Sequence, residues 1–171
     1  MPAETKNVII RDAREEDVPT LGAFKEGETF HRDRLRDADG AALRYLVAEI
    51  DGQVVAHGLL ALKQPATWPK MKHLPQMIDL FVRPDLRSRG IGRALIARME
   101  VLARAAGCAE MRLGVDPDNN PRALALYRAL GYIAIDTKPV RDRWEYIDSA
   151  GVRHGGVEWI IHMKKPLSPL L

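Results

Sequence analysis

The chain has 171 residues, of which 46% are apolar and 29% charged, and this composition is typical of one folded domain rather than of a disordered segment. The formal net charge is only +3, and basic residues are not interleaved with aromatic ones, so we expect no nucleic-acid partner. The first seven residues contain no signal core and no apolar run reaches the length of a membrane span, so we expect no membrane partner either. A single cysteine, Cys108, excludes an intrachain disulfide and favours a cytoplasmic location; we expect it to be a small apolar core residue.

Alternating apolar residues and turn signals predict several strands in the first half of the chain. A short helical region is predicted from Glu15 to Lys25, whereas the charged stretch Glu26–Ala42, broken by two glycines, fits either a second helix or a mobile loop. The pair Asp51-Gly52 predicts a tight turn between antiparallel strands. The predicted strands are Val8–Arg11, Leu43–Ile50, Gln53–Lys63 and Gln76–Val82, with a proline-containing loop over Gln64–Pro75.

The second half alternates between helical and strand patterns. Apolar residues recur at helical spacing from Gly90 to a glycine stop at Gly107, and Pro121 opens a second helix that ends near Gly131. The strand–helix–strand order predicts a parallel pair in the middle of one mixed sheet. The predicted strands are Met111–Val115, Tyr132–Asp136, Trp144–Ile147 and Val157–Met163, the last two forming a hairpin around a turn at Asp148–Gly156. We therefore expect an α/β fold and a single domain over residues 1–171, with residues 137–171 as its C-terminal hairpin and tail.

The turn Arg87-Ser88-Arg89-Gly90-Ile91-Gly92 follows a predicted strand and opens a predicted helix. Its glycines let the backbone approach a ligand closely, and the free N–H groups at a helix N-terminus attract an anion. Its arginines can add charge-assisted hydrogen bonds to phosphate. The turn lacks the third glycine of a dinucleotide-binding fingerprint, and the chain has no Gly-Lys-Ser/Thr sequence of a nucleotide P-loop. A different phosphorylated ligand is indicated.

Arg87, Gly90 and Gly92 fit the pattern R-x-x-G-x-G, which resembles the acetyl-CoA signature of the GNAT superfamily of N-acetyltransferases. A second stretch, from Asn120 to Tyr132, fits the family pattern N-x-x-A-x-x-x-Y-x-x-x-G-F/Y. In its order of elements the resemblance covers Val8 to Asp136. It implies a GNAT-like fold: a single mixed, mostly antiparallel sheet with a splayed central parallel pair and helices on both faces. It also implies transfer of an acetyl group from acetyl-CoA to a primary amine by direct attack.

The resemblance further implies which residues bind acetyl-CoA. The pyrophosphate would bind the backbone amides of the turn, which are those of Arg87, Ser88, Arg89, Gly90, Ile91 and Gly92. Backbone groups of Leu80 and Val82 would pair with the pantetheine arm as a peptide pairs with an open strand edge. The side-chain amide of Asn120 would bind the same arm. The five histidines show no ligand spacing, so we expect no metal site.

For catalysis, the resemblance assigns Tyr127 as the acid that protonates the departing thiolate, although on helical spacing alone its ring would simply pack on the sheet. The backbone amide of Val82 would stabilise the developing oxyanion.

The general base stays open at this point. Ile78 and Gly114 stand at positions where some family members carry a glutamate. Asp79 is the nearest carboxylate on the cofactor strand, but regular alternation places it on the face opposite Ile78 and Leu80 unless a bulge rotates it. The alternatives are Glu49, His57 or an ordered water molecule.

We expect a small-molecule amine as the acceptor, because no segment resembles a dedicated peptide-binding insert. A protein N-terminus or lysine side chain is the second choice, and a non-catalytic acyl-CoA-binding module is the alternative from another class. The segments expected on the acceptor side are Glu26–Ala42, Gln64–Pro75 and the tail. Arg141, Arg143 and Trp144 would line the acceptor side or form the surface of a homodimer.

Overall fold

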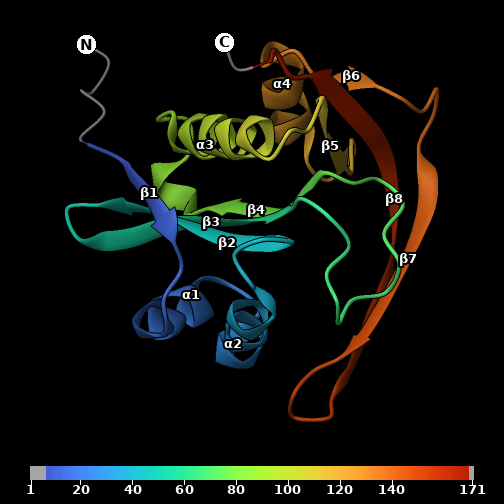
Figure 1. Ribbon diagram of the computed structural model, residues 1–171. Coiled ribbons are helices and arrows are strands. Elements are labelled where there is room, and N and C mark those ends of the chain that lie inside the picture. Colours follow the sequence, from blue (N-terminus) through green and yellow to red (C-terminus); the bar gives the residue numbers. More distant parts are fainter. Residues whose placement is uncertain (1–6, 170–171) are drawn as a thin grey trace.

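An open sheet of eight strands organises residues 7–169, the part of the chain that the computed structural model describes (Figure 1). The strand order is β1-β2-β3-β4-β5-β8-β6, and β7 pairs with β8 outside this path. The pairs are antiparallel except for β4 and β5, the parallel pair that the strand–helix–strand order predicts. The strands are β1 (Ile9–Asp12), β2 (Leu43–Ile50), β3 (Gln53–Ala61), β4 (Gln76–Val82), β5 (Glu110–Val115), β6 (Ile133–Ala134), β7 (Val140–Ile147) and β8 (Arg153–Pro166).

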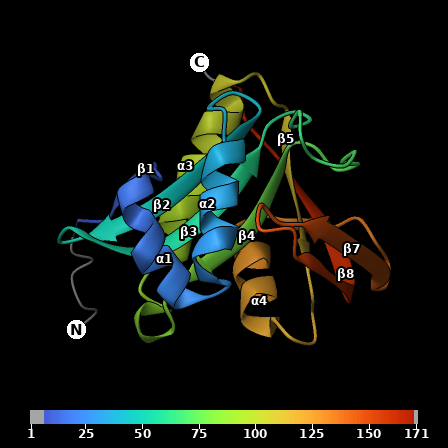
Figure 2. The ribbon, with the colours of Figure 1, turned by 90° about the horizontal axis from the view of Figure 1, so that it is seen from below.

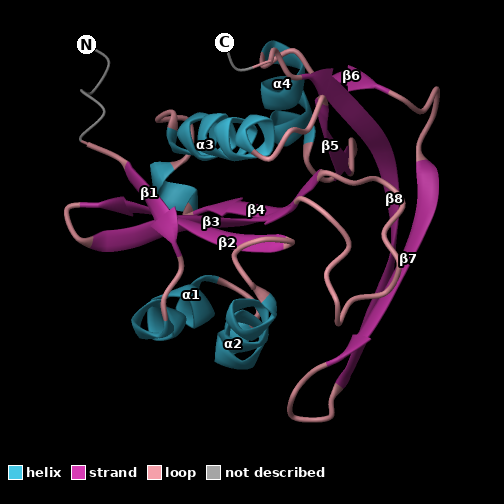
Figure 3. Cartoon of the chain, viewed as in Figure 1, coloured by secondary structure: helices cyan, strands magenta, loops and turns pink. Residues whose placement is uncertain are grey.

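Helices cover both faces of the sheet, with α1 and α2 on one side and α3 and α4 on the other (Figure 3). Each side has its own apolar cluster: Leu21 of α1 packs in one, and Leu95 and Met99 of α3 pack in the other. The charged stretch Glu26–Ala42, which the sequence left open, is helical from Gly27 to Asp37. The helices are α1 (Val18–Phe24), α2 (Gly27–Asp37), α3 (Ile91–Ala105) and α4 (Pro121–Ala129), with 3₁₀ turns at Glu15–Asp17 and Pro84–Leu86. Among the described residues, no helix has the length and apolar character needed to cross a membrane.

The parallel pair is splayed, as the family resemblance implies. β4 and β5 are paired at one position, Gln76 with Arg112, where the Arg112 N–H donates to the Pro75 carbonyl oxygen at 3.0 Å. Beyond this point the two strands diverge, so the C-terminal half of β4 has no partner strand on the side of β5.

One extra residue interrupts the pairing of β4 with β3. Leu59 faces Ile78, whereas His57 faces Phe81, so β4 uses one residue more than β3 over the same interval. Asp79 lies in this interval with a left-handed φ of 53°. The irregularity is therefore a β-bulge, which bends and twists the strand that carries it.

The C-terminal hairpin is longer than predicted. β7 ends at Ile147 as predicted but begins earlier, at Val140. β8 begins at Arg153, so the turn spans only residues 148–152 and the prediction of a turn through Gly156 is wrong. Gly156 instead lies in β8 opposite Trp144, and a Cβ at Gly156 would come within 2.9 Å of the indole ring. Glycine is thus required here because the ring covers the backbone of the neighbouring strand. β8 then continues into the main sheet and ends at Pro166, between β5 and β6.

Apart from α2, which ends five residues before the end of its predicted stretch, and Tyr132–Asp136, the other helices and strands match their predicted bounds to within about two residues. Only Ile133–Ala134 of Tyr132–Asp136 is a strand. The reason lies in Asp136, whose carboxylate accepts a hydrogen bond from the backbone N–H of His162 at 2.8 Å and so replaces a ladder bond with a side-chain bond.

A buried polar network joins α3 to the C-terminal half of the sheet. Glu100 of α3 is 6% exposed, and its carboxylate accepts hydrogen bonds from the Tyr132 hydroxyl at 2.9 Å and from Lys165 Nζ at 3.0 Å. A buried carboxylate needs such partners to compensate for its lost hydration. The Tyr132 end of the second motif therefore has a structural role.

Replacing Tyr132 with phenylalanine removes one donor from the buried carboxylate of Glu100. We expect the free energy of unfolding, measured by urea denaturation, to fall by about 1–2 kcal/mol. The control Tyr146→Phe, in the half-buried tyrosine of β7, should change it by less than about 0.5 kcal/mol. Unchanged stability in Tyr132→Phe would show that the hydroxyl does not support the network.

Candidate active site

The phosphate-binding turn predicted from the sequence lies between β4 and α3. Ser88 and Gly90 both have left-handed backbone conformations, with φ values of 63° and 82°. Left-handed residues in a turn bring successive N–H groups to one side, where they form a concave site for an anion. Gly90 is also the N-cap residue of α3, and because it has no side chain to cap the helix, it leaves the first N–H groups available to a ligand.

Gly92 marks the point where β4, α3 and α4 meet. A Cβ at this position would lie 3.6 Å from Cγ2 of Val82 and 3.7 Å from Cδ2 of Leu126. A side chain much larger than a methyl group would push the strand and the two helices apart. The second glycine of the turn thus keeps the end of β4 in contact with both flanking helices.

Two arginine side chains connect this turn to its neighbours, one from the turn itself and one from α4. The Nε of Arg87 donates to the Val82 carbonyl oxygen at 3.0 Å, and its guanidinium lies 5.5 Å from the centroid of the Phe81 ring. Arg122 of α4 donates a hydrogen bond to the Ser88 hydroxyl. The two contacts fix the turn to β4 and to α4, and they surround its backbone amides with positive charge.

Along the open edge of β4, the backbone groups of alternate residues point into the gap between β4 and β5. The Arg83 N–H donates to the Val55 carbonyl oxygen of β3 at 2.9 Å. Because successive N–H groups of a strand point to opposite sides, the N–H of the preceding residue, Val82, points away from β3. The same alternation directs the backbone groups of Leu80 toward the gap. These are the two residues that the sequence assigned to the pantetheine arm.

The helix α4 carries Asn120 and Tyr127, the two residues of the second sequence motif that the family resemblance assigns to the site. Asn120 is the N-cap residue, but its side chain makes no capping hydrogen bond, so its amide is available to a ligand. Tyr127 is 8% exposed, and its ring packs edge-on against Tyr132 with the centroids 6.1 Å apart. Burial raises the pKa of the Tyr127 phenol to about 12, so the hydroxyl keeps its proton at neutral pH.

The bulge decides where Asp79 points. Ile78 packs in the apolar cluster on the side of α1 and α2, whereas Leu80 packs in the cluster on the side of α3. Asp79 contacts Arg34 of α2, with 3.3 Å between Oδ2 and Nη2, so it shares a side of the sheet with Ile78. Regular alternation would place Asp79 opposite both neighbours, but the bulge, the exception that the sequence analysis allowed for, rotates it to the side of Ile78 because the extra residue changes the alternation.

Asp79 is partly enclosed but accessible to water. Its side chain is 38% exposed, yet the surrounding protein raises the pKa of the carboxyl group by desolvation, against the opposing effect of the Arg34 guanidinium. A water-accessible carboxylate with a raised pKa has the properties of a general base.

The other candidate bases are placed less favourably. His57 of β3 is 4% exposed and stacks on Phe81, and burial lowers its pKa to about 3, which makes it a weak proton acceptor. Glu49 lies on β2, two strands away from β4, and accepts a hydrogen bond from Arg11 Nε at 2.9 Å. Asp79 alone of these three combines a place on β4 with access to water and a raised pKa.

The family model of the acetyltransferase (GNAT) family matches residues 9–132. The chain belongs to this family. It is 33% identical over 112 residues to an IAA acetyltransferase of Azospirillum brasilense, which covers 66% of this chain and 69% of the relative. It is 38% identical over 78 residues to a thialysine N-epsilon-acetyltransferase of Bos taurus; this match covers 46% of this chain and 44% of that enzyme, less than half of its length. The solved structure of a putative acetyltransferase from Salmonella typhimurium with its cofactor acetyl-CoA has a TM-score of 0.69 over 97% of both chains at 18% identity, a likeness of fold.

Acetyl-CoA is the cosubstrate of GNAT enzymes, and the geometry described above fits it. The left-handed turn offers amides to a pyrophosphate, the splayed edge offers the N–H of Val82, and the Asn120 amide is not used by its own helix. No group of three histidine, cysteine, aspartate or glutamate side chains within residues 7–169 is arranged to hold a metal ion. Backbone amides, Tyr127 and Asp79 are the candidate groups for the GNAT chemistry.

Arg34, which contacts Asp79, and the aromatic residues around Arg34 were not identified individually from the sequence. Arg34 and Phe30 belong to α2, Trp68 to the loop before β4, and Tyr146 to β7. Phe30 and Arg34 are four residues apart and so share a helix face, a signal that becomes visible only once this stretch is assigned as a helix. The exposed pair Arg141 and Arg143 points to the opposite side of β7 from Tyr146, because the residues of a strand alternate.

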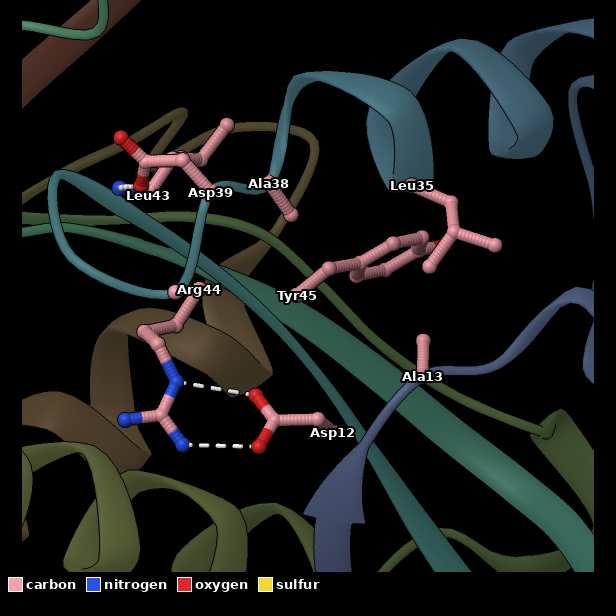
Figure 4. Close-up of a pocket in the computed structure, with 9 residues that line it drawn as sticks. Asp12, Ala13, Leu35, Ala38, Asp39, Leu43, Arg44 and Tyr45 are labelled. Carbon is pink, nitrogen blue, oxygen red and sulfur yellow. Dashed lines mark hydrogen bonds and ion pairs between the residues drawn. The ribbon is translucent and has the colours of Figure 1, made fainter.

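A separate hollow of about 450 Å³ lies beside β1 and β2 (Figure 4). Asp12 and Arg44 form a two-pronged ion pair there, with distances of 2.8 and 2.9 Å. Asp39 accepts hydrogen bonds from the backbone N–H groups of Ala41 and Ala42. Its charged groups are thus paired, and it is two strands away from β4, so we do not assign it to the GNAT chemistry.

Gly90→Glu should weaken coenzyme A binding by at least about tenfold, because a carboxylate and its bulk would enter the phosphate-binding turn. The matched control is Gly107→Glu, at the other end of the same helix. Gly107 also has a left-handed φ, of 83°, and open space around its Cβ position. Isothermal titration calorimetry should show near-native affinity for the control; equal affinities in both variants would remove this turn from the site.

Proposed function

We propose that the protein is an acetyl-CoA-dependent N-acetyltransferase that acts on the primary amine of a small molecule. The proposal is carried by an open edge of β4 that leads into a left-handed turn suited to an anion, at a point where α4, the helix of Tyr127, packs close to Val82 at Gly92. The names of the curated relatives support acetyl transfer, and thialysine, the substrate in one of these names, is an amine.

Acetyl-CoA supplies the acetyl group as an activated thioester. The acceptor nitrogen forms its bond to the acetyl carbon while the bond from that carbon to sulfur breaks. Positioning the amine against the thioester can lower the barrier by about 7–11 kcal/mol. The N–H of Val82 stabilises the negative charge that develops on the acetyl oxygen.

Two protons move in this reaction. The carboxylate of Asp79 takes the proton that the amine nitrogen loses, since Asp79 lies on the side of the sheet that faces α2 and water can reach it. The hydroxyl of Tyr127 gives a proton to the departing sulfur. Its raised pKa keeps that proton in place until the thiolate forms.

Tyr127→Phe should lower kcat by about 10²–10⁴-fold at saturating acceptor, because the departing sulfur then lacks its proton donor. Release of free thiol measures the rate. Tyr132→Phe is the control, since its hydroxyl is bound to Glu100 and its loss should affect stability more than kcat. Turnover of Tyr127→Phe at the wild-type rate would mean that Tyr127 is not the acid. A wild-type protein that binds acetyl-CoA but releases no thiol with any amine would be a binding module instead.

Asp79→Asn should lower kcat/KM by about 10²–10⁴-fold and remove the acidic limb of the pH profile. The base acts as the carboxylate, so wild-type activity should fall as the pH falls through the raised pKa of Asp79, above the ordinary value of 3.8. Asparagine tolerates the left-handed backbone at this position, so the bulge is retained. Glu49→Gln tests the rival base. Loss of the limb in Glu49→Gln but not in Asp79→Asn would exclude Asp79.

A further inference from the structure

Arg34 stands where the segments of the acceptor side meet. Its guanidinium carbon lies 4.6 Å from the ring centroids of Phe30 on α2 and Trp68 in the loop before β4, and 5.8 Å from that of Tyr146 on β7. Figure 2 shows α2 running beside β4, with the β7–β8 hairpin next to the same strand. Segments far apart in the sequence thus place three aromatic rings around one cation.

The ring cluster is held by hydrogen bonds from α2. The indole Nε1 of Trp68 donates to Asp37 Oδ2 at 3.0 Å, which fixes the loop. The backbone N–H of Ser149 donates to Asp33 Oδ2 at 2.9 Å, which fixes the tip of the hairpin. Arg34 lies between these two aspartates in the sequence, so the same helix positions the cation and the segments that surround it.

The guanidinium is incompletely paired. The aromatic rings surround the guanidinium of Arg34 but cannot replace the hydrogen bonds that its N–H groups form in the guanidinium plane. The only carboxylate paired with it among the described residues is that of Asp79, at 3.3 Å between Nη2 and Oδ2. The buried Nε has no hydrogen-bond partner among the described residues. By contrast, Arg44 makes two bonds to Asp12, at 2.8 and 2.9 Å. Arg34 is 20% exposed, so a ligand on the acceptor side can reach it.

We propose that Arg34 binds a carboxylate of the acceptor, and that the acceptor is an α-amino acid or an analogue whose amine and carboxylate share one carbon. This deepens the proposed function and rests on it. The cation of Arg34 and the neighbouring anion of Asp79 match the two charges of such a zwitterion. The acceptor's carboxylate binds Arg34 in place of the single contact from Asp79, and the acceptor's ammonium group donates a hydrogen bond to Asp79. The aromatic rings then contact the amino-acid side chain.

Two other acceptor classes fit this site less well. A polyamine carries only positive charges, so Arg34 would repel it. The N-terminus of a protein has an amide where an amino acid has its carboxylate, so it would leave Arg34 without the anion.

The test compares each L-amino acid with its carboxamide, which keeps the amine and the side chain but removes the charge. We expect the wild-type kcat/KM to favour the acid by about 10- to 100-fold. Arg34→Gln should bring this ratio close to one, and Arg34→Lys, which keeps the charge but loses the planar fork, should give an intermediate ratio. Arg32→Gln, on the same helix but with its partners Glu15 and Glu28 at the surface, should keep the wild-type ratio.

Binding of the same pairs to the protein in the presence of coenzyme A, measured by calorimetry, separates the two proposals. The role of Arg34 would be overturned if the wild type acetylated the amino acid and its carboxamide equally well, or if Arg34→Gln lowered kcat/KM equally for both. Either result would leave the proposed acetyltransferase activity standing. Acids that bind in an Arg34-dependent way but are never acetylated would support Arg34 and overturn the proposed function.

Discussion

A single extra residue in β4 is the constraint on which the site depends. Within residues 7–169, β4 pairs with β5 only at Gln76, and the bulge at Asp79 bends the strand further along, beyond that pairing. The backbone of Val82 faces the open gap beyond that point, and the bulge turns the carboxylate of Asp79 toward α2. The orientation of the candidate base is thus set by one backbone irregularity, and aspartate is one of the few non-glycine residue types that adopt a left-handed conformation readily.

The two sides of the sheet contribute different kinds of groups to the candidate site. On the α3 side, close packing at Gly92 and the anchored turn give a rigid surface built largely from backbone, which suits a ligand that does not vary. On the α2 side, long polar and aromatic side chains from separate segments meet around Arg34. Because the two groups of residues lie on opposite sides of the sheet, substitutions around Arg34 are expected to leave the turn unchanged.

The sequence predicted the parts of the site that depend on local backbone chemistry. The turn at Gly90 and the helix that carries Tyr127 follow from glycines, a helix-starting proline and regular apolar spacing. The splayed strand pair and its cofactor were available only through the family resemblance. The orientation of Asp79 could not be predicted, because a bulge arises from pairing between strands and leaves no periodic signal. Arg34 was missed for a similar reason: its significance comes from rings that are distant in the sequence.

An unpaired strand edge at the centre of a sheet also has a consequence for the behaviour of the protein in concentrated solution. Exposed backbone of this kind can recruit a strand from another molecule and begin aggregation. In β4 the bulge interrupts the straight ladder that such a strand would need, and Arg87 occupies the carbonyl of Val82 and adds charge at the mouth of the gap. The features that make room for a pantetheine arm therefore also discourage pairing with a second copy of the chain, so the open edge does not have to be covered by an additional segment.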